Sequence, residues 1–388
     1  MSTHKHIDLI CVAVLLCTVL LTILFMNGDR FGLRPMVDED TIQDPSSFTA
    51  NDLDGNWETS TATKIRLQDG DIRVSGQGAY AFENDVIINN AGYFLLSGSL
   101  TNGRILVNAH SSSKVFLMLN GVDVACRDDA CFQVLQAQKV FLTLAEDSEN
   151  RLSSGITRYR EALEDGRDGT LFTRDSLTIN GNGNLNIDAA YRHGIEANDD
   201  LTIAGGTITI VCPQDGISVN DGLGIQQASL TVLAGDDGLR IKSHEIGAFY
   251  MKTGSLDITC GSDGIQAETT AEILDSSCAI RAGDTGIQAA GAVTITGGSL
   301  LLEGCKHDFQ GEPIEQTDCE IVTFPGDSET LSAVPAQVPK MIPDPPPEPV
   351  ESNPENPAEY PHGTWQRVIL SILVLAAGLL AGFLFKKR

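Results

Sequence analysis

The sequence predicts an all-β fold, a single-stranded parallel β-helix in which successive coils stack as a solenoid. Five segments of the chain align with one another, and they begin at Gly194, Gly216, Gly238, Gly264 and Gly286. Their spacing is 22 residues, except for 26 residues between the third segment and the fourth. A repeat of this length is typical of solenoids, because each copy buries its apolar face against the next copy.

Each copy holds three short runs in which apolar residues alternate with polar ones. In the copy over residues 194–210, the apolar pairs are Ile195 and Ala197, Leu201 and Ile203, and Ile208 and Ile210. Alternation with a period of two predicts strands, and the Asp-Asp and Gly-Gly pairs between the runs predict turns. The conformational freedom of glycine suits tight corners at the repeat glycine and at the Gly-Gly pairs. Three strands and three corners describe a triangular coil.

Equivalent positions stay apolar in all five copies. The columns that begin at Ile195, Ala197, Ile203, Ile208 and Ile210 contain only Ile, Leu, Val, Ala, Met and Cys. We therefore expect each coil to pair with the next as parallel strands do, at about 4.8 Å. The extra residues of the longer copy, 243–249, are expected in a corner loop.

The coils before these copies are less regular. Residues 171–181 match the copy at Gly194 with a shift of 24, whereas residues 153–169 read as a surface excursion and residues 57–145 contain irregular alternating runs. About 270 residues at this repeat length predict about twelve coils, or about 60 Å of solenoid. A helical solenoid is excluded, because no copy has an apolar face with a 3.6-residue period over about ten residues.

Apolar segments near both ends predict one transmembrane helix on each side of the solenoid, at residues 7–26 and 366–385. Both segments suit a hydrocarbon core about 30 Å thick. The first lacks a small-residue cleavage site, which favours an uncleaved signal anchor. The positive-inside rule places the tails, residues 1–6 and 386–388, in the cytoplasm. We therefore expect a protein of the cell membrane whose residues 27–365 are extracellular.

The composition divides the extracellular part into three. Residues 27–55 form a juxtamembrane segment, residues 56–324 carry the β-helix, and residues 325–365 form a Pro-rich stalk. Eleven of the 15 prolines lie between residues 325 and 361. A segment of this kind is extended, like polyproline II, and would hold the solenoid away from the membrane.

The chain is strongly acidic, with a formal net charge of -26. This charge argues against nucleic acid or anionic lipid as a direct partner. The nine cysteines are irregularly spaced, and they form neither a disulfide framework nor a zinc-site pattern. The sequence leaves protein partners and the oligomeric state open.

Aspartates recur in register at the corners of the coil. They form two columns, one at the first corner and one just before the repeat glycine: Asp175, Asp199 and Asp221, and Asp215, Asp237 and Asp263. Stacked carboxylates lie within about 5 Å of one another, and they repel unless they are protonated or bridged by a cation. Calcium takes about six to eight oxygen ligands, so the columns predict calcium as a cofactor. The simpler alternative is that Asp favours turns and is solvated there.

No nucleophile–base pair stands out, so we expect a protein that is not an enzyme. Arg192, His193 and Arg240 lie at or beside the repeat corner, and next to calcium they could support lyase chemistry on an acidic sugar. Isolated residues of this kind are more often solvated. The candidates for stacking on a sugar ring lie beside or within corner loops: Tyr159, Tyr191 and Tyr250.

Five segments are distinctive in combination. They are residues 95–100, residues 115–122, Leu-Thr-Ile-Asn-Gly-Asn-Gly-Asn-Leu at 177–185, Gly-Ile-Glu-Ala-Asn-Asp-Asp-Leu-Thr-Ile-Ala-Gly-Gly-Thr-Ile at 194–208, and Asp-Asp-Gly-Leu-Arg at 236–240. These segments resemble the clostridial cell-surface family of carbohydrate-binding domain-containing proteins, and the resemblance covers roughly residues 57–310.

The resemblance implies a right-handed parallel β-helix, similar in shape to pectate lyases. It also implies calcium ions along the coil and plant-wall polysaccharides as ligands. Four residues match the family's acidic corner motifs: Asp199, Asp200, Asp236 and Asp237. The chain departs from the family at His193 and Thr285, where the repeat usually has Asp.

Taken together, these features predict a membrane-anchored, non-catalytic protein of the bacterial cell surface that binds polysaccharide with the help of calcium. Two alternatives stay open, a calcium-dependent polysaccharide lyase and a structural or assembly protein of the cell envelope. Unsaturated sugar products would identify the lyase. A crosslinked protein partner together with an absence of glycan binding would identify the structural protein.

Overall fold

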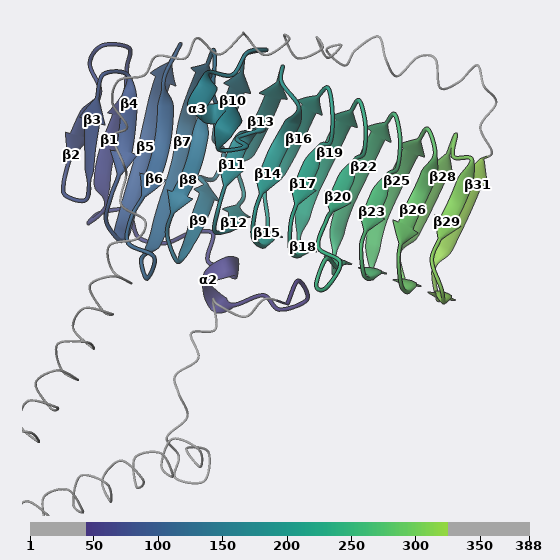
Figure 1. Ribbon diagram of the computed structural model, residues 1–388. Helices are drawn as coiled ribbons and strands as arrows, with labels where there is room; N and C mark the ends of the chain where they lie inside the picture. Colours follow the sequence, from purple (N-terminus) through teal and green to yellow (C-terminus); the bar gives the residue numbers. More distant parts are fainter. Residues whose placement is uncertain (1–43, 325–388) are drawn as a thin grey trace, which may run out of the picture. The chain divides into compact units, whose positions relative to one another are not determined.

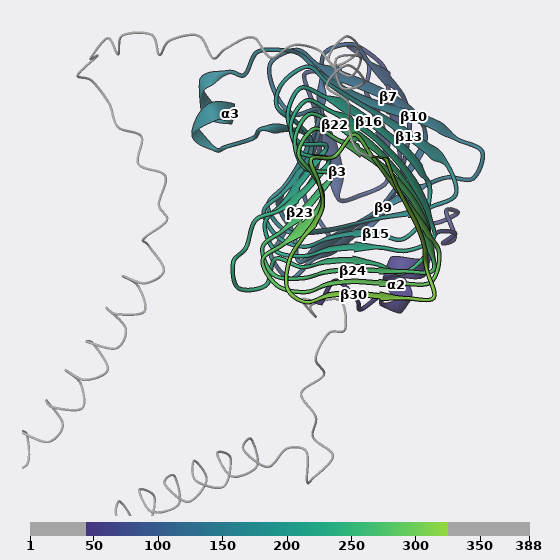
Figure 2. The same ribbon diagram turned by 90° about the vertical axis from the view of Figure 1, so that its right-hand side faces the viewer.

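The computed structural model describes residues 44–324, and its strands stack in sequence order along one axis (Figure 1). Seen along that axis, the chain winds round three faces (Figure 2). The predicted all-β parallel β-helix is therefore confirmed. Two short helices occur in the described residues, α2 (Ala50–Leu53) and α3 (Arg160–Glu164).

The predicted membrane spans at 7–26 and 366–385 lie outside the described residues, as do the stalk at 325–365 and both tails. Between residues 44 and 324, no helix is both long enough and apolar enough to cross a membrane. The segment that we expected to be juxtamembrane, 27–55, is described from residue 44 onward.

The first face is an eleven-stranded sheet that runs the length of the solenoid. Its strands, in spatial order, are β3 (Ala79–Phe82), β4 (Asp85–Ile88), β6 (Arg104–Asn108), β8 (Phe132–Gln136), β11 (Gly169–Thr173), β14 (His193–Ala197), β17 (Ile217–Val219), β20 (Leu239–Ile241), β23 (Ile265–Ala267), β26 (Thr285–Ala289) and β29 (His307–Gln310). All neighbours are parallel except β3 and β4, which form an antiparallel hairpin.

The other two faces are joined at the N-terminal end. The second face continues through β9 (Lys139–Leu144), β12 (Ser176–Gly181), β15 (Leu201–Ile203), β18 (Leu223–Ile225), β21 (Phe249–Met251), β24 (Ala271–Leu274), β27 (Val293–Thr296) and β30 (Ile314–Thr317). The third face continues through β10 (Glu149–Ser154), β13 (Asn184–Ala189), β16 (Thr207–Cys212), β19 (Ala228–Ala234), β22 (Gly254–Cys260), β25 (Ser276–Ala282), β28 (Ser299–Glu303) and β31 (Glu320–Phe324). They meet at the long strand β7 (Lys114–Cys126), which pairs with β9 and with β10 and follows β5 (Gly92–Leu100), β1 (Thr63–Leu67) and β2 (Arg73–Ser75).

Strand pairing follows the predicted columns. Ile195 pairs with Ile217, and the ladder continues to Leu239, Ile265 and Ile287. The columns that begin at Ala197, Ile203, Ile208 and Ile210 are confirmed in the same way. All of these side chains are buried, so the interior of the solenoid is one continuous apolar core.

The number of coils is smaller than predicted. The first face holds ten parallel strands from β4 to β29, so residues 44–324 form ten coils over about 43 Å rather than about twelve. The prediction was wrong because it applied the 22-residue spacing to coils that are longer. Phe132 pairs with Leu171, 39 residues later, because the predicted excursion and its helix α3 lie between them. The corner loop between β20 and β21 is confirmed.

The repeat glycines are needed for close packing rather than for an unusual backbone conformation. None of the five has a positive φ. A Cβ atom on Gly194 would lie 2.2 Å from Ile210 Cγ2 and 2.7 Å from the carbonyl oxygen of Gly216. The Gly-Gly pairs behave as predicted, since Gly205 and Gly206 have φ values of 154° and 83°.

Residues 44–57, which we call the N-terminal strap, pack across the outside of the second face. Asp52 in helix α2 is 0 % exposed, and its carboxylate lies 2.8 Å from Lys139 Nζ. Asn180 Nδ2 donates to the carbonyl oxygens of residues 51, 52 and 54. Phe48 lies against Tyr250 on β21, with ring centroids 6.3 Å apart. Part of the expected juxtamembrane segment is therefore packed on the solenoid.

Candidate functional site

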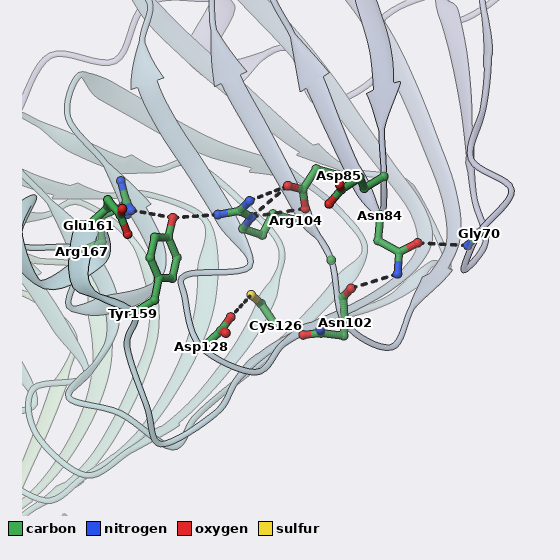
Figure 3. Close-up of a pocket in the computed structure, with 12 residues that line it drawn as sticks. Gly70, Asn84, Asp85, Asn102, Arg104, Cys126, Asp128, Tyr159, Glu161 and Arg167 are labelled. Atoms are coloured by element: carbon green, nitrogen blue, oxygen red, sulfur yellow. Dashed lines mark hydrogen bonds and ion pairs between the residues drawn. The ribbon is translucent and has the colours of Figure 1, made fainter. Parts of the chain in front are cut away.

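A groove of about 930 Å³ opens on the N-terminal part of the first face. The turn between β3 and β4 supplies Glu83 and Asn84 on one side, and the excursion supplies Tyr159 and Glu161 on the other. Arg104, the first residue of β6, lies between them (Figure 3). The groove is thus built where the turn, a strand end and the excursion meet.

Arg104 links the two sides of the groove. It pairs in register with Asp85, and its Nε lies 3.1 Å from that carboxylate. Its Nη1 donates to Asp129 at 2.9 Å and to the hydroxyl of Tyr159 at 2.8 Å. Burial opposes the charge of Arg104, but the ion pairs with Asp85 and Asp129 outweigh burial and raise its pKa. The guanidinium is therefore permanently charged and held in place.

Arg167 and Asp129 fasten the excursion to the first face. Asp129 is fully buried, and it accepts hydrogen bonds from Arg167 Nε at 3.1 Å and Gln133 Nε2 at 2.7 Å. Arg167 Nη2 donates to the Tyr159 hydroxyl at 2.8 Å. Burial and the charge of Asp129 raise the pKa of Tyr159, so the phenol stays neutral.

Amides and carboxylates form the rim of the groove. Asn84 Oδ1 accepts from the backbone N–H of Gly70 at 3.0 Å, and its Nδ2 donates to the carbonyl oxygen of Asn102 at 3.3 Å. The carboxylates of Asp128 and Glu161 also line the groove. Its lining residues include no histidine or serine, and burial raises the pKa of the Cys126 thiol. The amides and carboxylates of the groove can hydrogen-bond to hydroxyl groups.

The predicted acid column before the repeat glycine forms a hydrogen-bonded ladder. Asp215 Oδ1 accepts from the amide of Asp237 at 3.3 Å, and Asp237 Oδ1 accepts from the amide of Asp263 at 3.0 Å. Asp263 Oδ1 accepts from the amide of Thr285 at 2.9 Å. Burial and the neighbouring Asp237 raise the pKa of Asp215 to about 7, and burial raises that of Asp237. Asp236 lies beside this ladder, and its charge contributes to both shifts.

The other acid column lies near the N-terminal strap. Asp175 accepts from the amide of Ala137 at 2.8 Å, and Asp200 accepts from the amide of Gly222 at 2.9 Å. Burial and the charge of Asp199 raise the pKa of Asp200 to about 7. Burial, and then the charge of Asp199, raise the pKa of Asp221, which occupies the equivalent position in the next coil.

The predicted calcium ligands fit a cation unequally. Each carboxylate of the ladder already accepts a backbone amide, and Asp215 also lies 3.3 Å from His193 Nδ1. These contacts occupy part of each ladder carboxylate and leave it fewer lone pairs for a cation. Asp199 and Asp221 stand at equivalent positions of neighbouring coils, two residues after the paired Ala197 and Val219, and their like charges repel. In the part of the chain that the structure describes, no group of three or more His, Cys, Asp or Glu has the arrangement of a metal site.

The structure brings together three residues that the sequence marked as possible lyase residues. His193 is the first residue of β14 and directly follows Arg192, and Arg240 lies in β20, two strands further along the first face. His193 is connected to Arg240 through Asp215 and Asp237. Burial, followed by the charges of Lys242 and these arginines, lowers the pKa of His193 to about 3. Arg192 pairs with Asp168 at 3.0 Å, and Arg240 Nη1 lies 3.7 Å from Asp237.

The three predicted tyrosines lie in different places. Tyr159 lines the groove. Tyr191 is 7 % exposed, and the guanidinium of Arg158 lies 4.5 Å from its ring centroid, so its position favours packing. Tyr250 contacts Phe48 of the N-terminal strap.

Sequence reasoning missed most of the groove. Arg104, Asn84 and Asn102 lie in the irregular first coils, where no repeat aligns them with an equivalent position. Arg167 lies in the excursion, and its link to Arg104 through Asp129 and Tyr159 exists only in three dimensions. The one available signal was the placement of Tyr159 within an excursion.

Comparison with known proteins gives three matches. A family model described as "Carbohydrate-binding domain-containing protein" matches residues 82–317. A protein of the same description from Acetivibrio thermocellus is 31% identical over 134 residues, which are 34% of this chain and 47% of that protein, so the chain spans about half the length of this curated relative. A solved gadolinium derivative of the polysaccharide lyase-like protein from C. thermocellum has a TM-score of 0.55 and 23% identity, and the match covers 66% of this chain and 99% of that one. At that identity the likeness shows the fold alone.

Proposed function

This chain belongs to the family of carbohydrate-binding domain-containing proteins, and we propose that it binds polysaccharide, without cleaving it, in the groove between the β3–β4 turn and the excursion. The observation that carries the proposal is an open polar groove whose walls are tied together through Arg104 and Tyr159. Groups that are ordered before the ligand arrives lose little entropy on binding, which favours affinity.

The groove offers the groups that a sugar needs. A sugar hydroxyl both donates and accepts hydrogen bonds, so it suits a site that mixes amides with carboxylates. Asn84, Asn102 and Glu161 supply such groups at the rim. The ring of Tyr159 adds an aromatic surface at one wall.

A pull-down with a polysaccharide panel, followed by calorimetry on the ligands retained, tests this proposal. We expect Tyr159→Ala to abolish binding, because it removes a wall of the groove and the acceptor for Arg104 and Arg167. Tyr250→Ala is the matched control, since Tyr250 contacts Phe48 and does not line the groove. Equal binding by the wild type and both variants would reject the groove as the site.

The proposal of a non-catalytic protein rests on the properties of the candidate base. A general base works best when its pKa lies near the working pH, and His193 has a pKa of about 3. The specific observation that favours a lyase is that Asp215 and Asp237 connect His193 to Arg240, with Arg192 next to His193 in the chain. Incubation with acidic polysaccharides and detection of unsaturated ends by ultraviolet absorbance tests for this activity. Product that disappears in Arg240→Ala would establish the lyase.

Calcium assistance is a further part of the proposal, and it is confined to Asp199 and Asp221. Their equivalent positions in neighbouring coils support it, because a bound cation would relieve the repulsion between the two carboxylates. We expect calcium to raise the melting temperature of the wild type and not that of Asp199→Asn. Asp263→Asn is the matched control, since Asp263 belongs to the ladder. An unchanged wild-type melting temperature in calcium would exclude this site.

We propose that the apolar segments at 7–26 and 366–385 anchor the protein in the cell membrane with residues 27–365 outside the cell. The support is the hydropathy of these segments and the basic residues 386–388. Protease treatment of intact cells should release fragments of the solenoid. Protection of residues 44–324 in intact cells, with cleavage after lysis, would contradict this orientation.

A further inference from the structure

We infer that Tyr80 and Phe82 form an aromatic platform that extends the groove, and that groove and platform together take a neutral glycan. This inference rests on the proposed carbohydrate-binding function and adds a second contact surface and a ligand class. The two side chains are 47 % and 60 % exposed. Exposed aromatic side chains that lie next to one another on a folded domain commonly mark a binding surface.

The pairing of β3 with β4 fixes where these rings lie. In this antiparallel pair Phe82 is opposite Asp85, and Tyr80 is opposite Ile87. Val86 and Ile88 point into the core with 0 % exposure, so the alternate residues of β4 point outward. Residues directly opposite each other share a face of the sheet. Phe82 therefore lies beside Asp85, which lines the groove.

The platform continues into β6 as two parallel rows. Asp85 pairs with Arg104, and Ile87 pairs with Leu106. The outer surface thus carries two rows, one of Phe82, Asp85 and Arg104 and one of Tyr80, Ile87 and Leu106. A pyranose ring has hydroxyl groups at its rim and C–H groups on its faces. Such a ring can stack on Phe82 and Tyr80 while its hydroxyls reach the charged side chains beside Phe82.

The hairpin that carries the platform is fixed before any ligand binds. Glu83 turns the chain with a φ of 54°. Asn84 ties the turn to Gly70 and Asn102 through the two hydrogen bonds that form the rim of the groove (Figure 3). A platform held in this way binds a ring with little loss of conformational freedom.

The charges of the groove select a neutral ligand. The guanidinium of Arg104 is already paired with Asp85 and Asp129, and that of Arg167 with Asp129 and Asp165. The charges of both guanidiniums are therefore balanced by carboxylates of the protein itself. The carboxylates of Glu83, Asp128 and Glu161 line the same groove and repel the carboxylate of an acidic sugar. An uncharged sugar meets no such repulsion.

Calorimetry on the purified full-length protein tests the platform with three probes: a neutral glucose hexasaccharide, the corresponding disaccharide and a galacturonic acid hexasaccharide. We expect the wild type to bind the neutral hexasaccharide more tightly than the other two. Phe82→Ala and Tyr80→Ala should each lower the affinity for the neutral hexasaccharide about tenfold, as expected for the loss of one stacked ring. They should leave the affinity for the disaccharide unchanged, because the disaccharide occupies only the groove.

Two further variants separate the platform from other effects. Phe82→Trp keeps a stacking surface and should bind the hexasaccharide like the wild type. Phe324→Ala, which removes a phenylalanine that is 55 % exposed in β31, should have no effect. Circular dichroism of all variants reports whether the fold is retained.

The outcomes distinguish the two proposals. If the wild type binds no glycan of any kind, the proposed function fails and this inference fails with it. If the wild type binds glycan but Phe82→Ala and Tyr80→Ala leave the hexasaccharide affinity unchanged, the groove stands and the platform is overturned. Such a result would leave the platform as a surface for another protein. Equal or tighter binding of the acidic hexasaccharide overturns the neutral ligand class.

Discussion

Asp215 shows how one buried carboxylate can connect two coils. Its Oδ1 accepts the backbone N–H of Asp237 in the next coil, and the same contact recurs from Asp237 to Asp263. Burial and the neighbouring carboxylates raise the pKa of Asp215 from the ordinary 3.8 to about 7. Because the pKa of Asp215 is higher in the folded protein than in the unfolded chain, protonation of Asp215 stabilises the fold. This stabilisation is complete below pH 3.8 and is lost as the pH rises through about 7.

We expect the melting temperature of the protein to fall between pH 6.5 and about pH 8. His193, with a pKa lowered from 6.5 to about 3, acts in the opposite direction, but its contribution changes only between those two values. Asp215→Asn keeps the hydrogen-bond acceptor without the charge, so it should reduce this fall. Part of the fall should remain in this variant, because burial also raises the pKa values of Asp200 and Glu196 to about 7. Thermal unfolding at both pH values, in the presence of a chelator, measures the effect, and an unchanged pH dependence would refute it.

Close packing at the repeat glycine can be tested at Gly216. A Cβ atom there would lie 2.2 Å from Val232 Cγ1 and 2.6 Å from the carbonyl oxygen of Gly238. We expect Gly216→Ala to lower the free energy of unfolding by about 1–3 kcal/mol, as overpacking does. Urea unfolding followed by circular dichroism measures this change. Wild-type stability would show that neighbouring coils can move apart.

At the scale of elements, the N-terminal strap is attached by a buried ion pair. Lys139 on β9 and Asp52 in α2 are 6 % and 0 % exposed, and Thr178 Oγ1 also donates to the Asp52 carboxylate. An ion pair in such a place depends on both partners, because a single buried charge is costly. The pair therefore makes the strap a fixed part of the second face.

Removing one partner of this pair should be more harmful than removing both. Asp52→Asn leaves Lys139 buried without a counter-charge, and we expect it to lower the free energy of unfolding by about 3–5 kcal/mol. The double variant with Lys139→Met should recover part of this loss, because no buried charge remains. Urea unfolding of the three proteins gives the comparison. If the double variant is no more stable than Asp52→Asn, the ion pair is not the main attachment.

Elements that repeat were predictable, and elements that occur once were not. The ladder from Ile195 to Ile287 follows from self-similarity, since each copy confirms the register of the others. The groove depends on Arg104 meeting Tyr159 across 55 residues, and no second copy of that contact exists to reveal it. The strap has no periodicity, so nothing in its sequence predicted that it packs on the second face. The spacing that gave the register also misled the coil count, because the excursion lengthens one coil.

At the scale of the whole molecule, the strand pairing differs between the two ends of the solenoid. The strands β2 and β3 turn back antiparallel at the N-terminal end. At the other end, β29, β30 and β31 each pair on one side only within the described residues. Ile314, Val322 and Phe324 are exposed there. In a solenoid each coil is stabilised by its neighbours, so a coil with one neighbour is the weakest.

Hydrogen exchange followed by mass spectrometry should show this asymmetry. We expect amides of β29, β30 and β31 to exchange first among the strands, because they have one neighbouring coil and exposed side chains. Amides of β16 and β19, in the middle of the third face, should exchange last. Uniform protection along the solenoid would mean that all ten coils open together.

The excursion leaves the ladder on either side of it undisturbed, since Leu171 pairs with Phe132 before it and with Ile195 after it. The length of this loop therefore does not change the register of the strands on either side of it. A different loop could be grafted between β10 and β11, giving the groove a new wall opposite an unchanged turn. In such an architecture, exchange of a loop can change the ligand preference while the stacked strands that support the loop stay the same.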